Sequence, residues 1–428
     1  MHRWIEQLNA PEKSGRLEAL QELYRLYCGG RVHKLPVDAE YVNNHIHTTY
    51  SFSPYSPAKA VWMAFISGLS TAGIMDHDSV GGALEFIEAG QILQMPVTVG
   101  MECRVDMSAT RLAGKRINNP DQKGTAYMAV HGIPHNRLER VSAFIRPYQE
   151  HRNRRNREMI NNLNQIMGHY GMNISFERDV QPISMSHDGG SITERHILYA
   201  LVLRMLNILG RGEKLIRFLK EELQIHLNNR LETFLLDQEN PYYPYDLLGV
   251  LKSDMVEKFY MPAGDECPAV SDVITLCEEI GAISAYAYLG DVEDSVTGDK
   301  KAQKFEDDYL ELLFEVIKAI GFRAVTYMPS RNTRAQLERV KTLCERHGLF
   351  QISGEDINSP RQKFLCAAMK DESFKNLIDS AWALIGHEQA ATGNPEMAIF
   401  SKASDEKFLA LQDRVRYYKD MGKRNREV

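Results

Sequence analysis

The sequence predicts an α/β fold built as a distorted seven-stranded β/α barrel, with an inserted helical subdomain and helical N- and C-terminal extensions. Three features of the 428-residue chain predict it. Seven short apolar runs end in polar, histidine-rich or acidic residues, helical patterns lie between them, and one long segment has helical patterns only. Short apolar strands that alternate with helices are typical of parallel βα units, and a barrel of roughly 250 residues leaves room here for insertions.

The seven strands are expected where the apolar runs lie. These runs are residues 41–46, 71–75, 97–105, 126–130, 282–288, 324–327 and 349–353. Because the carboxyl ends of parallel strands meet at one face of a barrel, the polar residues that end the runs are expected at a common mouth.

The remaining segments predict helices in front of, within and behind the barrel. Residues 1–40 are expected to form an N-terminal helical extension, and residues 41–135 and 271–372 the two parts of the barrel. Residues 136–270 show helical patterns but no strand pattern. A loop of that length without structure is uncommon, so this segment is predicted to be the helical insertion. Residues 373–428 are predicted to form C-terminal helices.

The composition limits the classes of partner. A net charge of −6 gives no overall reason to expect nucleic acid or an anionic membrane. No window reaches the ~20 apolar residues of a membrane span, and the first residues lack the apolar core of a secretory signal. The six cysteines are scattered without a C-x-x-C pair, as expected of packing residues in a reducing compartment. A cytoplasmic protein without a membrane partner is therefore expected.

A pair of histidines ends the first predicted strand, in the stretch Asn43-Asn44-His45-Ile46-His47-Thr48. Alternate residues of a strand point to the same side, so His45 and His47 can face one point. Two converging imidazoles form half of a divalent-metal site. On its own the pattern is weak, because two histidines on a surface strand need no metal.

Acids and a third histidine end other strands. Asp76, His77 and Asp78 follow the second run, where the alternative interpretation is a charged turn with Asp78 as a helix N-cap. Glu102 lies within the third run, and a lone glutamate there is costly to bury without a partner such as a metal. Asp356 follows the last run. Because all of these motifs lie at strand ends, a shared metal site is favoured over the separate alternatives.

In this order the motifs resemble those of the polymerase-and-histidinol-phosphatase (PHP) family. The series is His-x-His-Thr at 45–48, Asp-His-Asp at 76–78, Gly-x-Glu at 100–102 and Ser-Gly-x-Asp at 353–356. The resemblance spans roughly residues 41–370. It implies a TIM-like barrel of seven strands, up to three divalent metals and, as in most members, hydrolysis of phosphate esters.

One branch of that family is especially similar. Residues 74–83 closely match the branch that cleaves small nucleotides and short RNA, and that branch carries an inserted helical subdomain. An Arg-Pro-His-like motif of that subdomain resembles Arg195 and His196 in the stretch Glu194-Arg195-His196-Ile197-Leu198.

The resemblance implies a first metal site formed by His45, His47, Glu102 and Asp356, all of which match the family's motif positions. The further candidate ligands are His77, His196 and, on the fourth strand, either His131 or Tyr127. Imidazole and carboxylate together suit zinc, iron or manganese. At least one ion is therefore expected.

The chain departs from the family pattern at three positions. Phe52 stands where the family has the Asp of a Ser-Asp-Gly motif, Tyr288 where it has the His of Ala-His-Pro, and Asn358 where it has the His of Asp-x-His. These replacements remove expected ligands of the second and third ions. A second ion is therefore left open.

These observations predict a metal-dependent hydrolase, in first place a phosphoesterase of a small phosphorylated metabolite or nucleotide. Water activated by the metal would attack, and Asp76 or His77 would manage protons. Arg195 and Arg331 are the candidate phosphate-binding residues, because the planar guanidinium suits phosphate. Two alternatives stay open: a hydrolase of an amide or lactone, and a metal-binding protein without catalysis.

A run of arginines raises the question of nucleic acid. Arg152, Arg154, Arg155 and Arg157 lie close together in one predicted helix. Such a charge run is usually a solvated helix face, so a nucleic-acid partner is not favoured. The expected partner is the small phosphorylated substrate.

Overall fold

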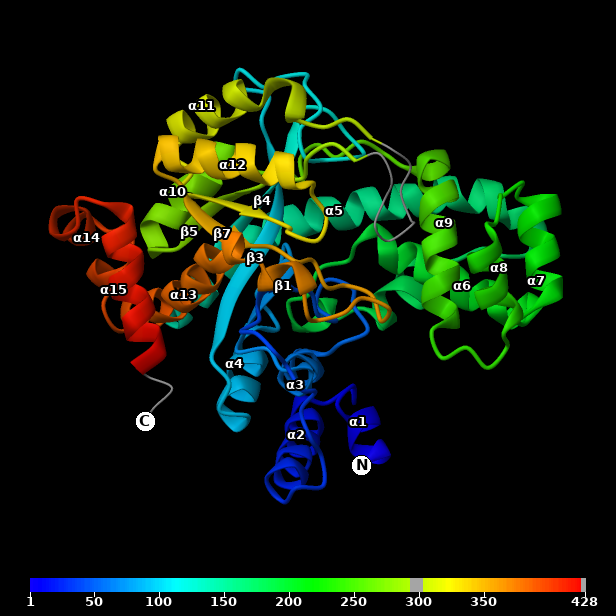
Figure 1. The fold of residues 1–428 in the computed structure, drawn as a ribbon. Coiled ribbons are helices and arrows are strands. Elements are labelled where there is room, and N and C mark those ends of the chain that lie inside the picture. Colours follow the sequence, from blue (N-terminus) through cyan, green and yellow to red (C-terminus); the bar gives the residue numbers. More distant parts are fainter. Residues whose placement is uncertain (293–302, 425–428) are drawn as a thin grey trace.

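The computed structural model describes residues 1–292 and 303–424, and its centre is one seven-stranded sheet curved into a nearly closed barrel (Figure 1). The strands follow one another in sequence order. They are β1 Val42–Ile46, β2 Thr71–His77, β3 Val97–Asp106, β4 Thr125–His131, β5 Ile283–Ala287, β6 Ala324–Tyr327 and β7 Phe350–Ser353. A parallel bridge between Ile46 and Ile357 joins the end of β1 to the segment after β7. The predicted distorted β/α barrel with seven strands is confirmed.

The direction of one strand differs from the prediction. β4 pairs antiparallel with both β3 and β5, whereas the other neighbouring strands are parallel. Among the described residues, the connection 107–124 between β3 and β4 contains no helix. A parallel return needs a crossover, usually an α-helix, so the chain turns back beside β3 as a long hairpin instead. The expectation of seven parallel βα units is therefore wrong at the fourth strand.

Helices cover the outer face of the barrel. They are α3 Pro57–Ser67, α4 Ala83–Ile92, α10 Val270–Ile280, α11 Leu310–Ile320 and α12 Arg334–His347. Local sequence defines their ends: Ser56 caps the amide of Lys59 at the start of α3, and Gly68, at φ 92°, ends that helix. Thr333 and Gln336 form a capping box at the start of α12.

The terminal segments are helical, as predicted. The N-terminal helices are α1 His2–Gln7 and α2 Lys13–Cys28, and the C-terminal ones are α13 Lys375–Gly393, α14 Lys402–Lys407 and α15 Leu411–Arg424. A buried ion pair between Arg16 and Glu85 fixes α2 to α4. α13 and α15 cross so closely that a Cβ on Gly386 would lie 2.0 Å from the carbonyl oxygen of Tyr418. Together they contribute side chains to the core beneath the barrel.

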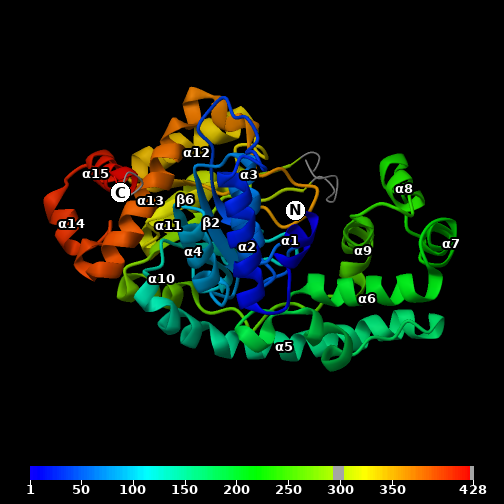
Figure 2. The ribbon, with the colours of Figure 1, turned by 90° about the horizontal axis from the view of Figure 1, so that it is seen from below.

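The segment between β4 and β5 forms a helical body with its own core. Its helices are α5 Leu138–Met167, α6 Glu194–Leu209, α7 Glu213–Arg217, α8 Asn229–Leu236 and α9 Tyr243–Phe259. The first half of α5 packs in the barrel core through Leu138, Val141 and Ile145. Its second half packs in the core of the insertion. Figure 2 shows α5 running from the barrel into the insertion as one helix. The two cores support the predicted segments, whose boundaries stay a prediction.

The remaining sequence expectations concern cysteines and membranes. All six cysteines are free, and five of them are buried. In the described parts of the chain, no helix combines the length and apolar character that crossing a bilayer requires.

Candidate metal centre

Three side chains converge at the mouth of the barrel. His45 lies in β1, His47 just after it and Glu102 in β3, and one ligand atom from each lies within 4.8 Å of the others. Nε2 of His45 is 3.7 Å from Oε2 of Glu102. The alternation of side chains along β1 turns both imidazoles to the barrel interior, as the sequence pattern predicts.

Asp356 and His77 complete the group. Nε2 of His47 is 3.3 Å from Oδ1 of Asp356, and Nδ1 of His77 is 3.1 Å from Oε2 of Glu102. Backbone pairing fixes these distances: His77 and Glu102 are partners in the β2–β3 ladder. Ile357, next to Asp356, exchanges hydrogen bonds with the backbone of His45 and His47.

The residues present fit a divalent ion. Two carboxylates and three imidazoles are the oxygen and nitrogen donors that zinc, iron or manganese accept. Nε2 of His47 is buried and makes no hydrogen bond to any of the described residues, although it faces Asp356. A cation between the two groups would satisfy this atom. The role of each residue as a ligand stays a prediction.

The electrostatics of the group favour anionic carboxylates beside a neutral third histidine. Burial acts against ionisation of Glu102, but the neighbouring imidazoles, His45 first, lower its pKa to about 2. Burial likewise opposes ionisation of Asp356, yet His47 holds the pKa of this carboxyl below its ordinary value. Burial lowers the pKa of His77 to about 3. A neutral imidazole can bind a metal or accept a proton.

A second layer of hydrogen bonds orients the first. Asp76 is buried behind the group and does not line the pocket. Its carboxylate accepts hydrogen bonds from Thr48 N at 2.7 Å, Thr48 Oγ1 at 2.6 Å and Ser51 Oγ at 2.6 Å. Ser51 Oγ also lies 3.2 Å from Nδ1 of His47. Asp76 therefore positions His47 through Ser51, as second-layer carboxylates do in metal sites. Its predicted role in proton transfer stays a prediction without direct access to the pocket.

The three residues that replace ligands of the resembled family either point away from the converging side chains or hold one of them in place. The ring of Phe52 packs in the core of the insertion. The hydroxyl of Tyr288 donates a 2.6 Å hydrogen bond to Asp307. The side-chain amide of Asn358 donates to Oδ1 of Asp356 at 2.7 Å. Of the three, only Asn358 contacts a member of the converging group, and it does so by fixing Asp356.

Two further predicted ligands, His131 and His196, are not among these converging atoms, and their role as ligands stays a prediction. His131 pairs with Gly100 in the β3–β4 ladder, one inward-facing layer below Glu102, and burial lowers its pKa to about 3. His196 lies at the third position of α6, where its Nδ1 accepts the backbone N–H of Thr193 at 3.0 Å. Neither belongs to the group of converging ligand atoms found among the described residues.

Of the two fourth-strand alternatives, Tyr127 is the residue that lines the pocket. It faces Arg104 in the ladder, and its ring centroid is 5.7 Å from that of His77. The reversed direction of β4 explains the placement, because residues early in this strand lie nearest the barrel mouth.

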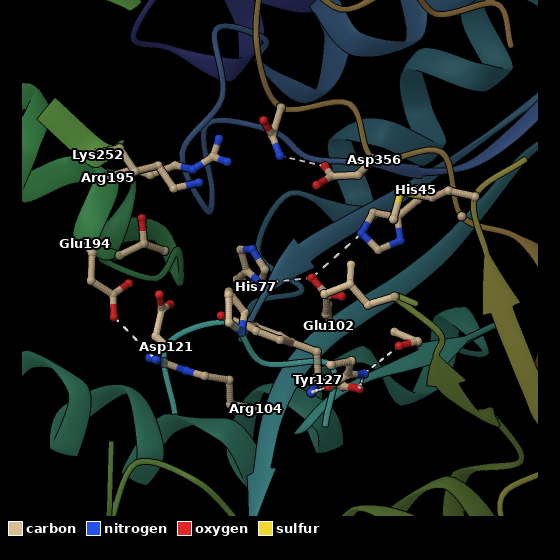
Figure 3. A pocket seen from close by; sticks show the side chains of 18 of the residues that line it. His45, His77, Glu102, Arg104, Asp121, Tyr127, Glu194, Arg195, Lys252 and Asp356 are labelled. Atoms are coloured by element: carbon tan, nitrogen blue, oxygen red, sulfur yellow. Dashed lines mark hydrogen bonds and ion pairs between the residues drawn. The ribbon is translucent and has the colours of Figure 1, made fainter. Parts of the chain in front are cut away.

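A cavity of about 300 Å³ opens over the group, between the barrel and the insertion. Figure 3 shows Arg195 and Lys252 on the wall formed by the insertion, across the pocket from His45 and Glu102. The predicted phosphate-binding Arg195 therefore faces the candidate metal centre. Arg331 does not line this pocket, and its Nε donates to the carbonyl of Leu289 at 3.2 Å.

Six charges, five of them buried, join the insertion to the barrel beside this pocket, and Arg104, Arg152 and Glu194 line it. The six are Arg104, Arg152, Arg155, Asp78, Glu194 and Glu266. Glu266 pairs with all three arginines, and Asp78, next to His77, pairs with Arg152. The expected solvated arginine face is therefore wrong for Arg152 and Arg155, whereas Arg154 and Arg157 are exposed. Arg152 and Arg155 lie on the same helix face as the buried Met159, and this spacing indicates a buried face that the sequence analysis did not use.

Comparisons with known proteins add a likeness of fold. No family model matches the chain, and no curated protein matches it. A crystal structure from Bifidobacterium adolescentis, of a protein provisionally described as a metal-dependent phosphoesterase, has a TM-score of 0.51 and 19% identity, covering 80% of this chain and 98% of that one. An amidohydrolase from Chromobacterium violaceum, with bound sulfate and no metal, has a TM-score of 0.48 and 16% identity, covering 76% and 89%. At 19% identity the similarity to the first of these structures concerns the fold alone, and the resemblance to the PHP family rests on its motifs.

Proposed function

We propose that this chain is a metal-dependent hydrolase, and specifically a phosphoesterase acting on a small phosphorylated metabolite or nucleotide. The observation that carries the proposal is the convergence of His45, His47 and Glu102 within 4.8 Å, with His45 and Glu102 lining a pocket. The description of the Bifidobacterium adolescentis protein as a metal-dependent phosphoesterase supports the same class.

In this proposal one set of residues holds the metal ion and another residue positions a ligand. His45, His47, Glu102 and Asp356 would hold a divalent ion, which when bound lowers the pKa of a coordinated water and withdraws charge from a phosphoryl oxygen. Asn358 keeps Asp356 in place through its 2.7 Å hydrogen bond. These contacts orient the ligands before substrate arrives.

Two residues have roles toward the substrate. His77, neutral because burial lowers its pKa to about 3, lies 3.1 Å from Glu102 and can either join the metal site or accept a proton. Arg195 lines the facing wall, where its guanidinium suits the non-bridging oxygens of a phosphate. The volume of about 300 Å³ favours a small substrate over a long nucleic-acid strand.

The test combines metal content with activity. Purified protein should contain at least one zinc, iron or manganese ion per chain, and should hydrolyse members of a panel of phosphomonoesters and phosphodiesters. The variant His47→Ala should lose both properties, whereas His226→Ala, at an exposed histidine of the insertion, should lose neither.

Three outcomes discriminate among the alternatives. Protein that binds no ion contradicts the metal centre. Protein that binds an ion but cleaves only amide or lactone substrates contradicts the phosphoesterase assignment, and protein that binds an ion and cleaves nothing supports a non-catalytic role.

A further inference from the structure

Phe52 has an unusual backbone conformation beside the candidate metal centre. Its φ is 89°, in the left-handed region that favours glycine, although it carries a large side chain. It lies in the loop between β1 and α3, five residues after His47. A strained residue of this kind persists only where its surroundings hold it, and such residues cluster at functional sites.

The core of the insertion is what holds Phe52. Its ring centroid lies 5.0 Å from that of His196, 5.4 Å from Tyr199 and 6.2 Å from Tyr245. As far as the described residues go, every other buried member of this core lies between Met159 and Phe259. Phe52 is thus the one side chain that the barrel part contributes to it, and only 8% of it is exposed.

The residue before Phe52 connects this anchor to a predicted ligand. Ser51 Oγ donates to Asp76 at 2.6 Å and lies 3.2 Å from Nδ1 of His47. Its backbone N–H donates to the carbonyl of Thr48 at 3.1 Å, which makes the turn tight. The position of the Phe52 backbone therefore determines where the Ser51 hydroxyl lies, and this hydroxyl fixes the ring of His47 with Nε2 toward Asp356.

We propose that Phe52 is a positioning residue, through which the helical insertion orients His47 for metal binding. The insertion would then raise the affinity for the ion without supplying a ligand to it. Where the resembled family has an aspartate, this chain uses the position to dock its insertion. The inference rests on the metal centre of the proposed function.

The first experiment compares two truncations in the same core. Phe52→Ala and Phe259→Ala each remove a buried ring from the insertion, but Phe259, at the end of α9, is remote in sequence from the β1–α3 loop and is not among the ring contacts of Phe52. Affinity for Mn²⁺ is measured by titration calorimetry on the full chain. We expect Phe52→Ala to weaken binding at least tenfold and Phe259→Ala to change it less than twofold. Equal affinities in the two variants would overturn the inference.

A second experiment tests the route through Ser51. Ser51→Ala should weaken Mn²⁺ binding, and adding Phe52→Ala should weaken it no further, because both act on the same imidazole. Independent, additive losses would refute the route. If Phe52→Ala does not fold, Phe52→Leu, which keeps an apolar side chain, replaces it, and we expect this variant also to bind Mn²⁺ more weakly.

The readouts separate this inference from the metal centre itself. With Co²⁺ bound, Phe52→Leu should show a visible absorption spectrum different from that of the wild type, because the orientation of His47 changes. Phe259→Ala should show the wild-type spectrum. A wild-type chain that binds neither ion refutes the metal centre, whereas a wild-type chain that binds while Phe52→Leu binds identically refutes only the role of Phe52.

Discussion

Glu266 is the acid on which three buried arginines converge, and its replacement by glutamine is predicted to destabilise the join between insertion and barrel. Its side chain is 2% exposed, and those of Arg104, Arg152 and Arg155 are 3%, 5% and 7% exposed. In the native protein three guanidinium groups face three carboxylates, those of Glu266, Asp78 and Glu194. Glutamine preserves the shape and removes one negative charge.

The magnitude follows from the burial of the group. Removing one partner of a buried ion pair leaves an uncompensated charge and costs about 3–5 kcal/mol. The matched control is Glu279→Gln, which breaks an ion pair with Arg140 whose side chains are 50% and 43% exposed. An exposed pair of this kind contributes about 1 kcal/mol or less, so the two variants should differ by at least ~2 kcal/mol.

The assay is equilibrium urea unfolding followed by far-UV circular dichroism. The midpoint of Glu266→Gln should move to clearly lower urea, with the slope unchanged, because a lower midpoint at constant slope reports a loss of stability. If Glu266→Gln and Glu279→Gln shift the midpoint equally, the six charges do not act as a buried network and the reasoning fails.

Two further predictions concern acid and packing. Burial lowers the pKa of His131 and His196 to about 3 and of His387 to about 4, from an ordinary 6.5. As the pH falls, the unfolded chain protonates these histidines before the folded chain does. Their full contribution to the free energy of unfolding is therefore present above pH 6.5 and decreases toward pH 4, and at pH 5 each histidine has lowered this free energy by roughly 2 kcal/mol. A urea midpoint that stays constant from pH 7.5 to pH 5 in metal-free protein would contradict this. Gly386→Ala, forced against Tyr418, should lower the unfolding free energy by about 1–3 kcal/mol. Gly249→Ala, whose added Cβ would meet no atom within 4 Å beyond its chain neighbours and the backbone of its own helix, should raise it by about 0.5–1 kcal/mol. Thermal melts of both variants that shift in the same direction would refute the close crossing of α13 and α15.

The strands could be predicted because each is a local apolar run, and the structure has all seven. Their direction could not be read in the same way. The apolar run 126–130 does not indicate whether its strand runs parallel or antiparallel to its neighbours. The antiparallel direction of β4 depends on the connection 107–124, which contains no helix. Tyr127 rather than His131 therefore lies at the pocket.

The convergence of His45, His47, Glu102 and Asp356 could be predicted for a different reason. Strand ends in a barrel share one mouth, so the order of motifs along the chain was sufficient. The ion-pair partners of Arg152 could not be predicted, because Asp78 and Glu266 lie far from it in sequence. A charged run shows its helix periodicity but does not show which distant acids neutralise it.

The helix α5 has a consequence for how far the insertion can move away from the pocket. Its 30 residues correspond to about 45 Å of continuous helix, half anchored under the barrel and half under the insertion. Pro147 lies between the two halves and removes one backbone N–H from the hydrogen bonds of this helix. A hinge there would still have to separate Asp78 from Arg152 and Arg104 from Glu266, because these ion pairs cross between the two bodies. Leaving such a buried charge unpaired costs about 3–5 kcal/mol, so the structure favours the arrangement in which the insertion stays against the barrel.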